Sequence, residues 1–298
     1  MFRRVLVPLD GSSFGEHALP FARSIACRAG ASLHLAHIHV IGVPMTLDSV
    51  PMFDTAMDTQ SRQQEQVYLA RLAQQLEAGG ELRVTTSLLD GAVAEALQEY
   101  AASSGVDLVV MTTHGRGAFS RAWLGSTADA LVRLAPVPIL LVRPCDLSPN
   151  MVPPVELRHV LIPLDGSPLA EQVLAHAATL GALTDARLTL LHAIAPEVTG
   201  GLPVPGHPTL EQARDIAQGY LDRIAERLGA QSLDVRTEIV VGHPATGILE
   251  YARSHTVDLI ALATHGRSGV ARLLLGSVAD KIVRGTTTPV MIYHPSSG

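Results

Sequence analysis

The sequence predicts an α/β protein made of two tandem, doubly wound, five-stranded parallel sheets with helices on both faces. Three observations predict it. The segment RVLVPLDGS at 4–12 returns as HVLIPLDGS at 159–167, and THGR at 113–116 returns at 264–267. The offset is 155 residues at the first pair and 151 at the second, so the repeated unit is a whole domain that can bury its own core. Within each copy, short apolar runs alternate with amphipathic segments, as in parallel sheets covered on both faces.

The duplication divides the 298 residues into predicted domains at 1–150 and 151–298. The net charge of −6, without a basic stripe, gives no reason to expect nucleic acid or an anionic membrane as a partner. Cys27 and Cys145 occupy non-equivalent positions, which argues against a disulfide framework and fits a reducing compartment. With no secretory leader and no apolar run long enough to span a bilayer, we expect a cytoplasmic protein.

The first half shows the elements in a regular order. An apolar run at 5–9, closed by Asp-Gly, predicts a buried strand. Apolar residues at three-to-four spacing over 14–28 predict a helix that stops at Gly30. Further strands are expected at 33–40, 82–88, 106–111 and 139–142, further helices at about 60–77, 93–102 and 126–134, and an irregular Pro- and Met-containing stretch at 42–58.

The second half repeats this order, with strands expected near 160–164, 188–192, 235–240, 257–263 and 290–293. The final strands, 139–142 and 290–293, are apolar and lie at a predicted sheet edge. An unprotected apolar edge invites association, so we expect them to pair with each other or with another chain. Pairing within the chain would make a pseudo-dimer of the two domains, and a homodimer is a second option.

In doubly wound sheets the ligand lies beyond the carboxyl ends of the strands, where the strand order reverses. Nine residues separate Gly115 from Gly125-Ser126 after the fourth strand, and the same spacing separates Gly266 from Gly276-Ser277. Glycine permits positive φ and close approach of backbone amides, serine caps a helix, and the helix dipole favours an anion. The pattern is also compatible with a plain turn and N-cap, but its repetition favours a phosphate site.

Asp10 and Asp165 end the first strand of each copy and precede Gly-Ser. They are interpreted either as turn formers or as hydrogen-bond acceptors for ribose hydroxyls or a metal-bound phosphate. These two interpretations are compatible. Arg116 and Arg267 lie in the glycine loops, where they either contact phosphate or are solvated.

The histidines also have two interpretations. His114 and His265 lie in the glycine loops and either donate to phosphate or fill a structural role. His37 and His39 are two apart on a strand and could bracket a metal, but only His37 has a counterpart, His192. A core or edge role for this pair is therefore favoured.

Three motifs, PLDGS after the first strand, the Gly-x9-Gly-Ser loop and the closing strand PVPILLV, together resemble the universal stress protein family in its tandem form. The resemblance covers both halves nearly end to end, one family domain in each. It implies a parallel sheet of order 3-2-1-4-5 flanked by helices. It also implies binding of ATP, since some members do so with the motif Gly-x2-Gly-x9-Gly-[Ser/Thr].

The resemblance places the aspartates at the ribose and Ile38 and Ala193 at the adenine. The chain departs from the motif at its first glycine, which is Thr112 in one half and Ala263 in the other. The added Cβ atoms restrict close approach, more so at the β-branched Thr112, so any nucleotide should favour the second half. The residues implied to bind it are Pro8, Asp10, Ile38, Thr112, His114, Gly115, Gly125, Ser126 and Thr127, and Pro163, Asp165, Ala193, Ala263, His265, Gly266, Arg267, Gly276, Ser277 and Val278.

The resulting functional hypothesis is a regulatory protein of the stress response that binds adenine nucleotide (ATP, ADP or AMP), with Mg²⁺ as a candidate companion, and has little or no catalysis. No P-loop, nucleophile elbow or zinc-protease helix is present. A slow ATPase and a nucleotide-free interaction scaffold are the alternatives. No catalytic residue and no resident metal site are predicted.

Overall fold

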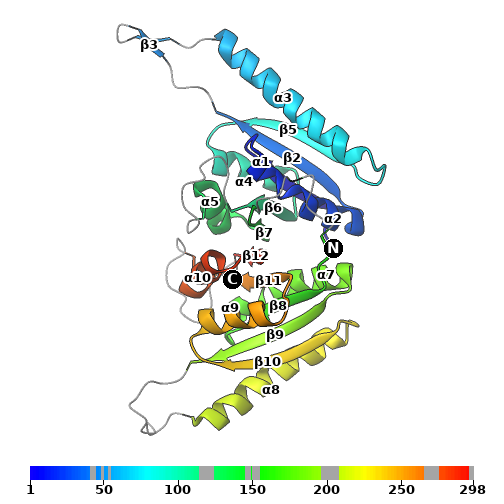
Figure 1. Cartoon of the computed structure of the whole chain (residues 1–298), viewed down its shortest axis with the longest axis vertical. Helices are drawn as coiled ribbons and strands as arrows, with labels where there is room; N and C mark the ends of the chain where they lie inside the picture. Colours follow the sequence, from blue (N-terminus) through cyan, green and yellow to red (C-terminus); the bar gives the residue numbers. More distant parts are fainter. Residues whose placement is uncertain are drawn as a thin grey trace.

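The structure is a computed structural model that describes residues 1–40, 45–47, 50–52, 55–113, 124–144, 149, 155–195, 208–264 and 275–294 (Figure 1). The first half contains β1 (Arg4–Leu9), α1 (Ser13–Glu16), α2 (Leu19–Ala29), β2 (Ser32–His39), β3 (Met45–Leu47), β4 (Val50–Met52), α3 (Thr55–Glu77), β5 (Val84–Asp90), α4 (Val93–Ser103), β6 (Leu108–Thr112), α5 (Ser126–Leu134) and β7 (Ile139–Val142). The second half contains β8 (His159–Pro163), α6 (Pro168–Glu171), α7 (Leu174–Thr184), β9 (Arg187–Ile194), α8 (Leu210–Gly229), β10 (Val235–Val241), α9 (Pro244–Ser254), β11 (Leu259–Ala263), α10 (Ser277–Gly285) and β12 (Val290–Tyr293).

The two halves form one ten-stranded sheet of order β10-β9-β8-β11-β12-β7-β6-β1-β2-β5. Within each half the strands pair in parallel and follow the order 3-2-1-4-5, which confirms the predicted fold. The strand order reverses between β1 and β6 in the first half and between β8 and β11 in the second. The ligand edge of the sheet therefore lies at the carboxyl ends of these four strands.

The halves meet through their last strands, which is one of the two pairings expected for these apolar edges. β7 and β12 pair antiparallel, with Ile139 opposite Ile292 and Leu141 opposite Val290, at the middle of the molecule in Figure 1. Beyond β7, the Arg143 guanidinium donates to the carbonyl oxygens of Val283 (3.0 Å) at the end of α10 and of its neighbour (2.6 Å). The pairing removes two open edges and makes the chain a pseudo-dimer.

Strand alternation divides the core into two layers, one on each face of the sheet. Val5 and Val7 of β1 face the core under α2 and α3, while Leu6 faces the core under α4 and α5. Both layers continue across the junction into the second half, where α7 and α8 cover one face and α9 and α10 the other.

Some element limits differ from the prediction. The helix expected over 14–28 is divided into α1 and α2, and the second half has the same division into α6 and α7. Gly30 ends α2 at φ 63°, as predicted. α3 begins at Thr55 rather than near residue 60, and the stretch expected to be irregular contains the antiparallel hairpin β3–β4. The predicted boundary at residues 150 and 151 lies outside the described residues and stays a prediction.

Among the described residues, no helix combines the length and hydropathy that a membrane span requires.

Candidate functional site

Each half has a cavity at the ligand edge of its sheet. The first, of about 380 Å³, is lined by seven predicted site residues: Pro8, Asp10, Ile38, Thr112, Gly125, Ser126 and Thr127. The second, of about 270 Å³, is lined by the seven equivalent residues: Pro163, Asp165, Ala193, Ala263, Gly276, Ser277 and Val278. The remaining predicted residues, His114, Gly115, His265, Gly266 and Arg267, lie outside the described residues, as does Arg116.

The cavity walls include apolar side chains that the sequence reasoning did not single out. Val93 and Leu97 of α4, with Met111 of β6, line the first cavity. Pro244 and Ile248 occupy the equivalent places in the second half. The apolar face of the helix after the third strand carried a signal for them, because that face packs on the second strand of its half, whose carboxyl end forms part of the cavity wall.

The two aspartates are held at the mouth of their cavities by the following serine. Asp10 Oδ1 accepts hydrogen bonds from the Ser12 amide (3.0 Å) and hydroxyl (2.6 Å). Asp165 Oδ1 accepts the same pair from Ser167, at 2.9 and 2.7 Å. The turn-forming interpretation is confirmed by these bonds. They also fix the carboxylate in place, while a role toward ribose stays a prediction.

The glycines before α5 and α10 differ from the expectation. Gly125 has φ −58° and Gly276 has φ −56°, so neither needs a positive φ. Each glycine is itself the N-cap, and Ser126 and Ser277 are the first helical residues, with no side-chain cap bond in either case. The expected serine caps are therefore wrong. The helix starts one residue earlier than a serine cap requires.

Backbone donors remain at these helix starts. The glycine amides are already bonded to the strand, Gly125 N–H to Thr113 O (2.8 Å) and Gly276 N–H to Thr264 O (2.9 Å). The next amides belong to the first helical turn, which has no intrahelical acceptor for them. Ser126 and Ser277 line the cavities, so these amides and the positive end of the helix dipole lie at the cavity wall.

The charge around the cavities is sparse. Among the described lining residues the only ionised side chains are Asp10 in the first half and Asp165 in the second. An anion in either cavity would therefore be met by backbone amides and helix dipoles. No group of three or more His, Cys, Asp or Glu side chains within the described ranges is arranged to hold a metal ion. His37 bonds through Nδ1 to the Leu9 carbonyl at 2.8 Å, which is the core role that we favoured.

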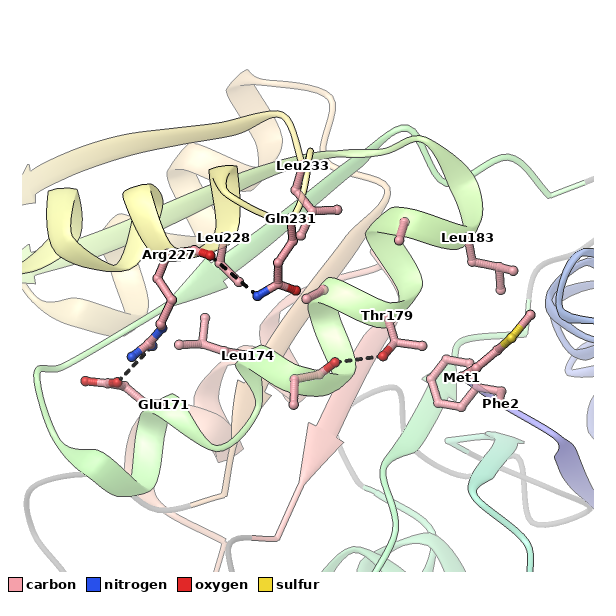
Figure 2. A pocket seen from close by; sticks show the side chains of 13 residues that line it. Met1, Phe2, Glu171, Leu174, Thr179, Leu183, Arg227, Leu228, Gln231 and Leu233 are labelled. Atoms are coloured by element: carbon pink, nitrogen blue, oxygen red, sulfur yellow. Dashed lines mark hydrogen bonds and ion pairs between the residues drawn. The ribbon is translucent and has the colours of Figure 1, made fainter.

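A larger groove, of about 670 Å³, lies between α7 and α8, away from the ligand edge (Figure 2). Met1 and Phe2 of the first half enter it beside Leu183, and an ion pair joins Arg227 to Glu171 at 3.3 Å. The first half has an equivalent groove of about 590 Å³ beside α2 and α3. These grooves are valleys between neighbouring helices and contain none of the predicted site residues.

Residues 1–143 and 156–294 each match the model of the universal stress protein family. A universal stress protein of Mycolicibacterium smegmatis is 29% identical, over 98% of this chain and 97% of its own. One from Mycobacterium tuberculosis H37Rv is 26% identical over the same shares. Among solved structures, a putative universal stress protein from Pseudomonas aeruginosa has a TM-score of 0.68 at 18% identity, covering 99% of this chain and 94% of its own. One from Archaeoglobus fulgidus has a TM-score of 0.66 at 20% identity, covering 99% and 97%. At these identities the structures show the fold alone.

Proposed function

The chain belongs to the universal stress protein family, with one family domain in each half, and from this premise we propose that it is a regulatory protein of the stress response that binds adenine nucleotide. The observation that carries the proposal is the convergence of seven motif residues on one cavity in each half. They come from separate strands and helices and meet at the edge where doubly wound sheets bind ligands. ATP, ADP and AMP are all candidates.

The cavity lining suits the three parts of a nucleotide. The apolar walls, Ile38 with Leu97 in the first half and Ala193 with Ile248 in the second, offer a surface for the base. The fixed aspartate carboxylates offer acceptors for ribose hydroxyls. The first-turn amides of α5 and α10 offer donors to phosphate without any lysine or arginine among the described lining residues.

We propose that the second half binds more tightly. Ala263 and Thr112 occupy the same place at the end of the fourth strand, and both line their cavity. The threonine adds two heavy atoms where phosphate would approach the main chain. The cavity volumes favour the first half, 380 against 270 Å³. We give the local steric effect more weight, because hydrogen bonds to phosphate need close approach, whereas extra room beside the base is filled by water.

The lining also favours binding over turnover. Efficient phosphoryl transfer needs a metal clamp and a positioned water or base. The described part of each cavity offers one carboxylate and no basic side chain. We therefore propose that the nucleotide acts as a signal, whose presence changes the surface seen by a partner, and that hydrolysis is slow or absent.

Titration calorimetry of the full chain with ATP, ADP and AMP, each with and without Mg²⁺, tests this proposal. We expect two sites of unequal affinity, of which Asp165→Ala weakens the tighter and Asp10→Ala the weaker. Glu226→Gln, on the exposed face of α8, is the control and should change neither. Absence of heat with all three nucleotides would leave the scaffold function. Steady phosphate release that Asp165→Ala removes, with binding intact, would instead indicate a slow ATPase.

A further inference from the structure

His39, the last residue of β2, has its side chain enclosed between two carboxylates of α3. Its Nδ1 lies 2.7 Å from Glu65 Oε2 and its Nε2 lies 2.8 Å from Asp58 Oδ1, and 2% of the side chain is exposed. Carboxylate oxygens only accept hydrogen bonds, so both ring nitrogens must donate. A neutral imidazole carries one N–H. The geometry is therefore that of an imidazolium bound to two carboxylates.

The groups around His39 form one connected network. Arg62 of α3 donates to Asp58 (3.1 Å) and to Asp90 at the end of β5 (2.5 Å). His37 of β2 lies 3.5 Å from Glu65 Oε1. The titratable and charged groups that face His39 are therefore His37 from β2, Asp58, Arg62 and Glu65 from α3, and Asp90 from β5. We name them the His39 network.

This network is the main attachment of the first half of α3. The buried residues of the helix are Leu69 and Leu72, both in its second half, where Arg71 also reaches Glu16. No residue from 55 to 67 is buried, and the first apolar side chain of α3 that packs against the core is that of Tyr68. Apolar burial is the usual force that holds a helix on a sheet, and it is missing over these turns. Ion pairs must hold them instead.

The second half lacks the network. Strand pairing places Ile194 where His39 stands and Val241 where Asp90 stands. Tyr68 of α3 meets His37 edge-on, and Tyr220 of α8 meets His192 in the same way. The two tyrosines therefore align α3 with α8. In this alignment Leu210 takes the position of Asp58, and Ala217 takes that of Glu65. Ala217 is buried, and a capping box of Thr209 and Gln212 fixes the start of α8. The start of α8 therefore needs no ionised group.

We propose that His39 is a proton-dependent clamp, present in the first half alone, which holds residues 55–65 of α3 on β2 and β5 and releases them when it loses its proton. A neutral His39 ring has one N–H for its two carboxylate neighbours. At the other ring nitrogen, a lone pair would face a carboxylate oxygen, and the hydrogen bond there would be replaced by repulsion. Release would leave α3 attached through Leu69 and Leu72. The proposal does not depend on nucleotide binding.

The direction of the pH response follows from the network. Hydrogen bonding to Asp58, and then to Glu65, raises the pKa of His39 above its ordinary 6.5 against the opposing effect of burial. A group with a raised pKa stabilises the folded state fully below its unfolded pKa and loses that contribution as pH rises through the folded pKa. His39 and Arg62 lower the pKa of Asp58, and Arg62 lowers that of Asp90. These carboxylates become protonated only at acid pH, so the clamp opens on the alkaline side.

Hydrogen exchange of the full chain, measured by mass spectrometry at about pH 6 and about pH 9 with exchange times corrected for intrinsic rates, tests the clamp. We expect protection of residues 55–65 to fall about tenfold or more at the higher pH, because the neutral ring keeps only one of its two hydrogen bonds to carboxylates. Residues 210–219 of α8 are the internal reference and should change by less than about twofold.

A matched variant installs the second-half residues: His39→Ile, Asp58→Leu and Glu65→Ala together. It should keep the far-UV circular dichroism of the wild type and show no pH response in residues 55–65. If it does not fold, titration of the His39 ring by NMR in the wild type decides, because the clamp requires its pKa to exceed that of exposed histidine. An equal pH response of α3 and α8, a response retained in the folded variant, or a His39 ring that titrates at or below 6.5 would overturn the proposal.

Discussion

The two halves of this chain solve the same local problems with different residues. Three turns with left-handed backbone in both halves use glycine in the first half and another residue in the second: Gly30, Gly80 and Gly105 against Asp185, Ser232 and Thr256. The start of the outer helix is attached by charge in the first half, whereas in the second half it is attached by the buried Ala217 and fixed by a capping box. The fold thus dictates where the chain must turn and which helix must pack, while the chemistry that achieves it is free to vary.

The hydrogen bonds of the two halves agree at the carboxyl ends of the first and fourth strands, where the strand order reverses. Asp10 and Asp165 make the same pair of bonds to the following serine, and Gly125 and Gly276 make the same bond to the fourth strand. These residues lie at the ligand edge. The contrast between constant ligand edges and variable turns and helices supports a shared role for the two edges.

The largest expected effect concerns the core. Leu6 and Leu161 are equivalent, and at most 1% of either side chain is exposed. Leu6→Ala and Leu161→Ala should each lower the free energy of unfolding by about 3 kcal/mol, because both create a cavity in the layer that spans the halves. Urea unfolding followed by circular dichroism measures this. If one variant shifted only part of the transition, the two halves would unfold independently, contrary to their shared sheet.

The next effect concerns the first motif position. Exchanging Thr112→Ala and Ala263→Thr should reverse the order of the two nucleotide affinities. We expect about a tenfold change in Kd at each site, or about 1.4 kcal/mol, because the threonine hinders approach of phosphate to the main chain. Calorimetry of the exchanged chain, with the single variants as controls, checks it. An unchanged order would show that cavity volume outweighs the added side-chain atoms.

A smaller effect concerns the junction. Arg143 donates to the carboxyl end of α10, while its counterpart His294 bonds to Thr264 Oγ1 within its own half. Arg143→Met should lower the free energy of unfolding by about 1 kcal/mol, since the carbonyl groups at the carboxyl end of α10 lose their cationic donor. His294→Ala, which leaves the junction intact, is the control. Equal effects of the two variants would contradict the special role of Arg143.

The smallest effect concerns the turns. Thr256 has φ 47°, which is unfavourable for a β-branched residue, and its counterpart is Gly105 at φ 61°. Thr256→Gly should raise the free energy of unfolding by about 0.5–1 kcal/mol by relieving strain. Gly105→Thr should lower it by more, because the new Cβ would also approach Arg4 Nη1 at 3.1 Å. Thermal unfolding of the two variants measures both, and a destabilised Thr256→Gly would show that the threonine side chain holds the turn.

The sequence predicted the strands and the ligand edge, because burial on both faces makes the central strands uninterrupted apolar runs, and it gave pairing of the last strands with each other as one of two options. It placed seven residues at each cavity, because the motifs follow the strands whose ends define the edge. It did not predict the N-cap position of Gly125, which depends on one residue of helix register. Nor did it predict the His39 network, because His39, Asp58 and Asp90 are brought together only by the sheet and α3.

The most direct test of nucleotide binding follows the backbone amides at the two helix starts by NMR during titration with ADP. We predict that the amide resonances of Ser277 and Val278 shift first, and those of Ser126 and Thr127 at higher concentration, while residues lining the groove at Leu174 and Leu228 stay unchanged. Shifts confined to that groove, or no shifts at saturating ADP, would contradict phosphate binding at the amino-terminal ends of α5 and α10.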